Sequence, residues 1–138
     1  MELTPKETEI IRKSHKMLVP EIDRVANEFY ADLFRRNARI REIFREDLSA
    51  QGMRFMSAIS VIVDNLDNPE ALDREVSLLA EGHAHLGIRP EWYRTMEEAL
   101  IDTFRYALGA RFTNETQLAW RSAFGQICEA MKARAATS

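Results

Sequence analysis

The sequence predicts an all-α protein of about six or seven helices that fold as one domain. Apolar residues recur at spacings of three and four along most of the 138 residues, as they do on one face of an α-helix. No segment alternates apolar and polar residues as a half-buried β-strand would, and no internal repeat or linker is found. Because the periodic segments differ in length and end at sharp turns, we expect crossed helix packing rather than a regular bundle.

Capping chemistry and apolar spacing predict the first two helices. Thr4, Pro5 and Glu7 form the pattern of a capping box that starts a helix, and Pro20 marks its end. A second helix opens at Pro20 and presents one apolar face. The core residues expected on that face are Ile22, Val25, Ala26, Phe29, Tyr30 and Leu33.

Two more helices are predicted in the middle of the chain. A short connecting segment ends in Phe44, and Ser49 then caps a helix that extends to about Leu66. After a turn, another helix covers 70–86, and Gly87 ends it as a C-terminal cap.

The last two predicted helices follow directly. Arg89 and Pro90 start a helix that Gly109 ends, and Thr113 caps the final one. We expect the tail at 133–138 to be frayed.

Composition and charge exclude several classes of protein. The formal net charge is -3 and no stripe of Lys and Arg alternates with aromatic residues, so nucleic acid is not an expected partner. Cys128 is the single cysteine, which rules out an intrachain disulfide and indicates a partly buried, inert thiol. No apolar run is long enough for a membrane span, and the N-terminus lacks the apolar region of a signal peptide. We therefore expect a cytoplasmic protein.

Two neighbouring histidines are predicted to face opposite sides of the helix over 70–86. His83 continues the core-facing stripe, whereas His85 continues a stripe that is mostly polar. The other members of the core-facing stripe are Leu72, Val76, Leu79 and Ala80. A buried imidazole needs partners for its nitrogens, and the partner is a backbone carbonyl in a structural reading or a metal in a functional one.

Tyr30 and Gln51 also place polar groups on apolar helix faces. Tyr30 can be explained structurally as a tyrosine hydrogen-bonded to a backbone carbonyl, and Gln51 as a glutamine exposed to water. A metal or ligand held between the three helices would explain Tyr30, Gln51 and His83 together. One imidazole in an apolar pocket with open space opposite is the pattern of haem ligation. HExxH, CxxC, P-loop and GxSxG motifs are absent, and His83 and His85 project about 200° apart, which disfavours a zinc site.

Four motifs spread over residues 5–132 carry a family resemblance. They are FYADLF at 29–34, IREIF ending in Phe44, GHAHLGIRPEWY at 82–93 and LGARFTNETQLAWRSAFG at 108–125. Their combination resembles the bacterial single-domain haemoglobins related to the globin part of flavohaemoglobins. The resemblance implies a globin fold around a pocket for haem b, with 1–138 as a single globin domain and no reductase domain.

The same resemblance implies roles for individual residues. His83, four residues before Gly87, matches the proximal iron ligand, and Tyr93 matches the tyrosine under the haem on that side. Tyr30 and Gln51 match the pair that hydrogen-bonds bound O2. The other expected cofactor contacts are Phe44, Arg54, Phe55 and Ile88.

Three positions depart from the family pattern. Ala38 replaces a proline before the haem-stacking Phe44, and Gly82 replaces a basic residue before the proximal histidine. Ala135 stands where flavohaemoglobins place a glutamate that hydrogen-bonds with the proximal pair. Losing that carboxylate lowers the basicity of the imidazole and favours ligand binding over peroxidase-like activation.

The expected function is reversible O2 binding, for transport or storage, with NO or CO as further ligands. The alternative is a nitric-oxide dioxygenase that depends on a separate reductase. A haem-based sensor is less favoured, because it would need a second domain or a ligand-dependent surface and the sequence indicates neither. A haem-free helical domain is less favoured, because it would leave Tyr30, Gln51 and His83 without a common purpose. A monomer and a homodimer are both compatible with the sequence.

Overall fold

The computed structural model describes residues 2–44 and 48–137, except for the side chains of 48–51 and 135–137. This described part of the chain forms seven α-helices and two 3-10 turns, and it contains no strand. The elements are α1 (Pro5–Leu18), η1 (Val19–Glu21), α2 (Ile22–Arg36), α3 (Ala38–Ile43), α4 (Leu48–Asp64), α5 (Pro69–Leu86), α6 (Trp92–Leu108), η2 (Gly109–Arg111) and α7 (Asn114–Thr137). The predicted all-α class is confirmed.

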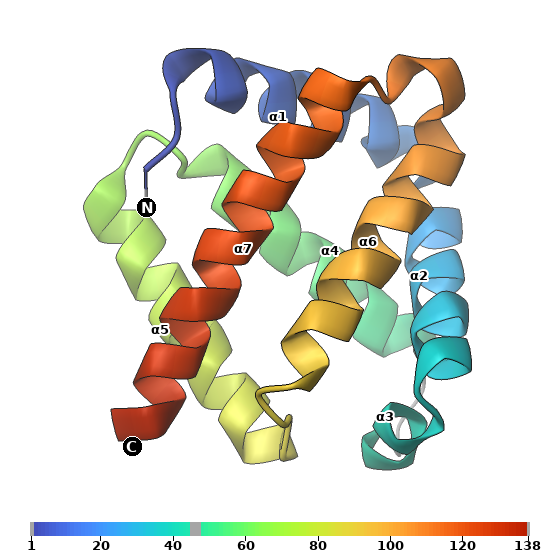
Figure 1. Cartoon of the computed structure of the whole chain (residues 1–138), viewed down its shortest axis with the longest axis vertical. Helices are drawn as coiled ribbons and strands as arrows, with labels where there is room; N and C mark the ends of the chain where they lie inside the picture. The colour runs from blue at the N-terminus through green and yellow to red at the C-terminus, as the bar shows by residue number, and fades with distance from the viewer. Residues whose placement is uncertain (1, 45–47, 138) are drawn as a thin grey trace.

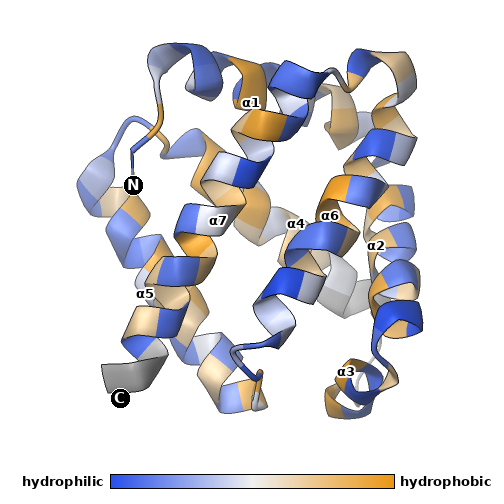
Figure 2. Cartoon of the chain, in the orientation of Figure 1, coloured by the Kyte–Doolittle hydropathy of each residue, from blue (hydrophilic) through white to orange (hydrophobic). Residues whose placement is uncertain are grey.

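The helices cross rather than forming a parallel bundle. In Figure 1, α6 and α7 lie in front, α2 flanks α6, and α5 flanks α7. Helix α1 runs across one end and packs on α7, while α4 passes behind and packs closely on α2. Figure 2 shows hydrophilic and hydrophobic residues together on each of the long helices. No helix within the described ranges combines the length and hydropathy that crossing a bilayer requires.

The predicted caps at Thr4, Gly87 and Thr113 are present. The backbone N–H of Glu7 donates to Thr4 Oγ1 at 3.1 Å, and Glu7 Oε1 accepts from the Thr4 N–H at 2.9 Å. Gly87 ends α5 with a φ of +81°, a left-handed conformation that glycine adopts without strain. Thr113 Oγ1 accepts from the N–H of Thr116 at 3.2 Å at the start of α7.

Three local predictions were wrong. The segment before Phe44 is a short helix, α3, whose Asn37 cap accepts from the Arg39 N–H at 3.0 Å. Helix α4 already includes Leu48, so Ser49 lies inside it rather than capping it. Helix α7 continues through Thr137, so the frayed tail expected at 133–138 is helical over most of its length.

A large apolar cluster joins α1, α2, α4, α6 and α7. At its centre the indole of Trp120, 1% exposed, packs edge-on against Phe104. The Trp120 Nε1–H donates to Ser14 Oγ at 2.8 Å, and that hydroxyl donates to the Ile10 carbonyl at 2.7 Å. In a smaller apolar cluster α5 packs against α7. Its members include Leu72, Val76, Ala80, Ile127 and Met131.

Candidate functional site

A partly open cavity of about 80 Å³ lies where the two apolar clusters meet. Its walls come from α2, α4, α5, α6 and α7. Most of the lining side chains are apolar, among them Ile59, Ile62, Met96, Leu100, Ile127 and Met131. A mainly apolar cavity with a few polar groups is the usual form of a cofactor site.

His83 reaches this cavity from α5 with one ring nitrogen already bonded. Its Nδ1 lies 2.7 Å from the carbonyl oxygen of Leu79, one helical turn earlier. Because a carbonyl oxygen only accepts, Nδ1 carries the proton and Nε2 keeps its lone pair. Burial lowers the pKa of His83, and the hydrogen bond to Leu79 opposes that shift. The imidazole is therefore neutral, in the tautomer that binds a metal through Nε2.

The structural reading of His83 predicts a bond to a backbone carbonyl, and the structure contains that bond. The bond satisfies Nδ1 alone, and among the described residues no hydrogen bond reaches Nε2. An imidazole with one nitrogen fixed by its own helix and the other available is the arrangement that metal-binding histidines share.

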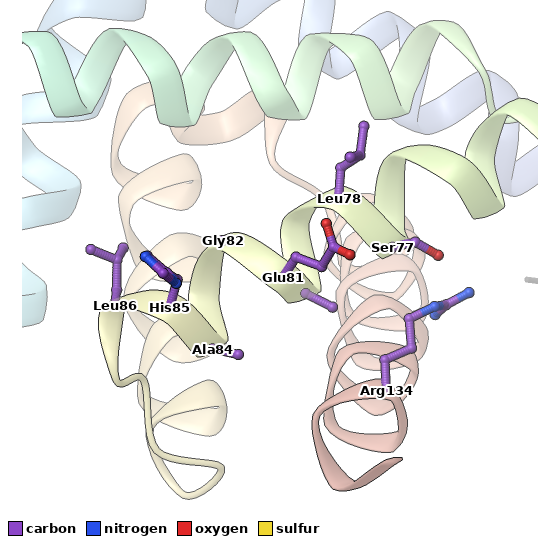
Figure 3. A pocket seen from close by; sticks show the side chains of 9 residues that line it. Ser77, Leu78, Glu81, Gly82, Ala84, His85, Leu86 and Arg134 are labelled. Atoms are coloured by element: carbon purple, nitrogen blue, oxygen red, sulfur yellow. The ribbon is translucent and has the colours of Figure 1, made fainter. Parts of the chain in front are cut away.

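The other two histidines lie away from the cavity. His85 is exposed on α5, where it lines a surface groove together with Leu86 and with Arg134 of α7 (Figure 3). His15 lies on α1, where its Nε2 is 3.0 Å from the hydroxyl oxygen of Ser60. The prediction that His83 faces inward and His85 outward is confirmed, and the three imidazoles do not converge.

Tyr93 approaches His83 from α6. The two rings are stacked with centroids 6.0 Å apart and planes 24° from parallel. Burial raises the pKa of the Tyr93 phenol, and the neighbouring Cys128 raises it further. The phenol therefore keeps its proton and can act as a hydrogen-bond donor at neutral pH.

Tyr30 belongs to an aromatic cluster on the α2 and α4 side of the cavity. Its ring packs edge-on against Phe44 at 5.5 Å and against Phe55 at 6.0 Å. Phe55 in turn stacks on Phe29, with centroids 4.5 Å apart and planes 7° from parallel. Phe29 and Phe55 line the cavity, so Tyr30 packs directly against its wall.

Helices α2 and α4 approach closely beside this cluster. A Cβ on Gly52 would lie 3.0 Å from the Cβ of Ala26 and 3.8 Å from the ring of Tyr30. Carbon atoms in ordinary contact are about 3.5–4.0 Å apart, so a side chain at Gly52 would require the two helices to shift by a few tenths of an ångström.

The remaining predicted residues lie around the cavity or outside the description. Phe44 is half-buried at the end of α3, and Arg54 is exposed on α4. Ile88 is half-buried just after α5, where its N–H donates to the carbonyl oxygen of His83 at 3.1 Å. Gln51 is in α4, but its side chain lies outside the described residues. The predicted residues that line the cavity itself are His83, Tyr93 and Phe55.

Among the lining residues that the sequence analysis did not assign to the site are Phe29, Glu97 and Cys128. Burial raises the pKa of the Glu97 carboxyl, and burial raises the pKa of the Cys128 thiol to about 12. Glu97 is four residues after Tyr93, so helical spacing alone would have placed both on one face. Phe29 was predicted only as core, because its contact with the cavity depends on how α2 crosses α4. The predicted inert character of Cys128 agrees with its raised pKa.

The residues on the cavity fit a haem in donor chemistry and in polarity. A single neutral imidazole with a free Nε2, set in apolar walls, is one of the ways in which proteins hold haem iron. A porphyrin is much larger than the cavity, so its entry requires the walls to separate. Helices α4 and α5 share few contacts, whereas α2 packs extensively on α4 and α5 on α7.

The chain is similar to known proteins over most of its length. The globin family model matches residues 27–131. A flavohemoprotein of Rhizobium meliloti is 28% identical over 130 residues, which cover 92% of this chain and 32% of that protein. A flavohemoprotein of Bordetella pertussis is 24% identical over 135 residues, covering 96% of this chain and 34% of that protein. The chain thus spans about a third of the length of these relatives. It belongs to the globin family and is a haem-binding globin related to flavohemoproteins.

Proposed function

We propose that this globin binds O2 reversibly at a haem b held by His83. The observation that carries the proposal is the bond from Nδ1 of His83 to Leu79, which leaves Nε2 available on an apolar cavity. When bound, haem supplies an iron that takes the imidazole on one face and a diatomic gas on the other. The sequence has one cysteine and no CxxCH motif, which supports haem b rather than a covalently attached haem.

Tyr30 and Gln51 are the proposed hydrogen-bond donors to the gas. A bound gas that gains negative charge is stabilised by hydrogen-bond donors in a site from which water is excluded. Each such bond contributes about 1.5–3 kcal/mol, which slows release of the guest about tenfold to a hundredfold. The ring of Tyr30 is 4% exposed, so little water competes for its hydroxyl. The role of Gln51 comes from the family resemblance.

The partner of Nδ1 supports gas binding over oxidative chemistry. A carboxylate at this position would make the imidazole more basic and favour cleavage of an O–O bond. Here the acceptor is the neutral carbonyl of Leu79. Nitric-oxide dioxygenation with a separate reductase is the alternative, since it would use the same residues. Sustained NO consumption by the purified protein with a supplied reductase would favour that alternative over simple O2 binding.

The test is an absorption spectrum of the purified protein in oxidised, reduced and CO-treated forms. We expect a Soret band that shifts with CO in the wild type and in His85→Ala, since His85 is exposed on the far side of α5. His83→Ala should lose stable haem uptake, because it removes the nitrogen that the cavity presents. Equal loss of the band in both variants, or a wild type that stays colourless with excess hemin, would contradict the proposal.

A further inference from the structure

We propose that Glu97 is a redox-linked proton acceptor, which binds one proton from solvent when the site gains one electron. This inference rests on the proposed function, because the electron is taken up by the iron of a haem held by His83. Among the described residues that line the cavity, Glu97 alone carries a carboxyl group. Its place in the fold and the state of its neighbours together carry the inference.

Glu97 lies in the wall between the cavity and a surface cleft. Tyr93, Glu97 and Cys128 line both the cavity and this cleft, which has a volume of about 340 Å³. The wall is formed by α6 and α7, which pack on each other, and Oε1 of Glu97 would lie 3.9 Å from a Cβ on Gly125 of α7. The carboxyl therefore borders the haem site on one side and the protein surface on the other. It can exchange protons with solvent without leaving its place.

The other polar groups on the cavity keep their protonation states. The carbonyl oxygen of Leu79 holds the Nδ1 proton of His83, and Nε2 is the proposed iron ligand. Burial raises the pKa of the Tyr93 phenol and raises the pKa of the Cys128 thiol to about 12, so both stay neutral at physiological pH. Among the described groups on the cavity, Glu97 is thus the one that can change its charge near neutral pH.

No contact in the described part of the chain holds Glu97 in its ionised form. Its carboxylate takes part in no hydrogen bond or ion pair there. Burial raises its pKa, whereas Arg121 and Lys132 on α7 lower it. On α6, Glu98 raises the pKa and Arg94 lowers it. The described residues of α2, α4 and α5 place no charged side chain on the cavity wall, so a new charge in the cavity acts on Glu97 directly.

Charge balance links the proton to the electron. An added electron makes an apolar site more negative, and an ionised carboxylate in the wall disfavours that electron. In the proposed step, one electron enters from an external one-electron donor such as a reduced flavin. One proton enters from the cleft and converts the Glu97 carboxylate to the neutral acid, so the net charge of the site is unchanged. By reciprocity, the reduced protein holds this proton more tightly than the oxidised protein does.

The first test is a redox titration of the haem, followed by absorption between about pH 5 and 8, above the ordinary pKa of a carboxyl. The midpoint potential of the wild type should fall as the pH rises, because the carboxylate becomes ionised. We expect proton affinity to differ about tenfold between the redox states, equivalent to about 59 mV between the acid and alkaline limits. Glu97→Gln should keep the acid-limit potential throughout, since its amide is neutral at every pH.

Glu98→Gln is the matched control. Glu98 is the next residue of α6 and lines the same cleft, but it does not line the cavity. This variant loses the same charge and should retain the pH dependence of the wild type. A wild-type potential that does not change with pH would overturn the inference, as would Glu97→Gln with the same pH dependence as the wild type.

The second test uses the full chain without haem and separates this inference from the proposed function. Carboxyl NMR of protein labelled at its glutamates follows each titration, and the resonance absent from Glu97→Gln identifies Glu97. Its titration should be centred above the ordinary glutamate pKa of about 4.3. An ordinary pKa in a protein that binds haem would refute the inference alone. A raised pKa in a protein that takes up no haem would refute the function proposed above, and the redox link with it.

Discussion

Replacing Gly52 and Gly82 by alanine should change stability in opposite directions. Both glycines lie inside long helices, Gly52 in α4 and Gly82 in α5. A Cβ on Gly82 would meet no atom within 4 Å, whereas a Cβ on Gly52 would lie 3.0 Å from the Cβ of Ala26. The two substitutions therefore share their effect on the backbone and differ in the packing that the new methyl group meets.

The magnitudes follow from these contacts. Alanine in a helix interior is more favourable than glycine by about 0.8–1 kcal/mol, so Gly82→Ala should stabilise the protein by roughly that amount. At Gly52 the same gain is opposed by overpacking, which typically costs about 1–3 kcal/mol. Both atoms of the close contact are Cβ atoms fixed by the backbone, so no rotamer change relieves it and the helices must shift. We expect Gly52→Ala to be less stable than Gly82→Ala by about 1–3 kcal/mol.

The assay is urea unfolding of the two variants and the wild type at the same haem content. The backbone contribution is the same in both variants and cancels. The difference between their free energies of unfolding therefore measures the packing cost of a methyl group at position 52, where α2 crosses α4. Gly52→Ala should also alter gas release, since the shifted helices carry Tyr30 and Phe55. If both variants gain the same stability, α2 and α4 are not in tight contact at this point.

Two further substitutions test individual groups. Tyr30→Phe should speed O2 release about tenfold in stopped-flow measurements, because it deletes one donor; an unchanged rate would mean that the hydroxyl does not reach the guest. For His15, burial lowers the pKa in the folded protein, and nearby Asp64 opposes this. The unfolded chain then takes up a proton first as the pH falls below about 6.5, so stability declines there. His15→Gln, which keeps a polar group for Ser60, should weaken that decline in urea titrations, and identical pH profiles would contradict the assignment.

Features of the fold that depend on a few neighbouring residues were predictable from the sequence. The capping box of Thr4 and Glu7 and the glycine cap at Gly87 each involve groups within one helical turn, so their residue types alone indicate them. The short helix α3 was missed because six residues give too little apolar periodicity to recognise. The continuation of α7 was missed for a different reason: Arg134, near its end, pairs with Asp73 of α5, a contact that only the fold creates.

At the site, too, features set by residues within one helix were predictable, whereas contacts between helices were not. Helical register placed His83 inward and His85 outward, and it also makes the carbonyl of Leu79 the natural acceptor for Nδ1 one turn earlier. The stacking of Phe29 on Phe55 was beyond prediction, because it depends on the height and angle at which α2 crosses α4. Family resemblance supplied roles for single residues, but it did not indicate which of them meet in space.

The two sides of the pocket are built by different helix pairs, and this has a consequence for how the protein can vary. The imidazole is positioned by α5 on α7, through Val76 and Ile127 in the smaller apolar cluster and through the ion pair of Asp73 with Arg134. The opposite wall is positioned by α2 on α4, through the Ala26 and Gly52 contact and the phenylalanine stack. Few contacts join α4 to α5 directly, but α6 packs on both α2 and α7 and therefore connects the two pairs. Substitutions in the α2–α4 pair should therefore act first on how fast the gas leaves, and any effect on His83 should pass through α6.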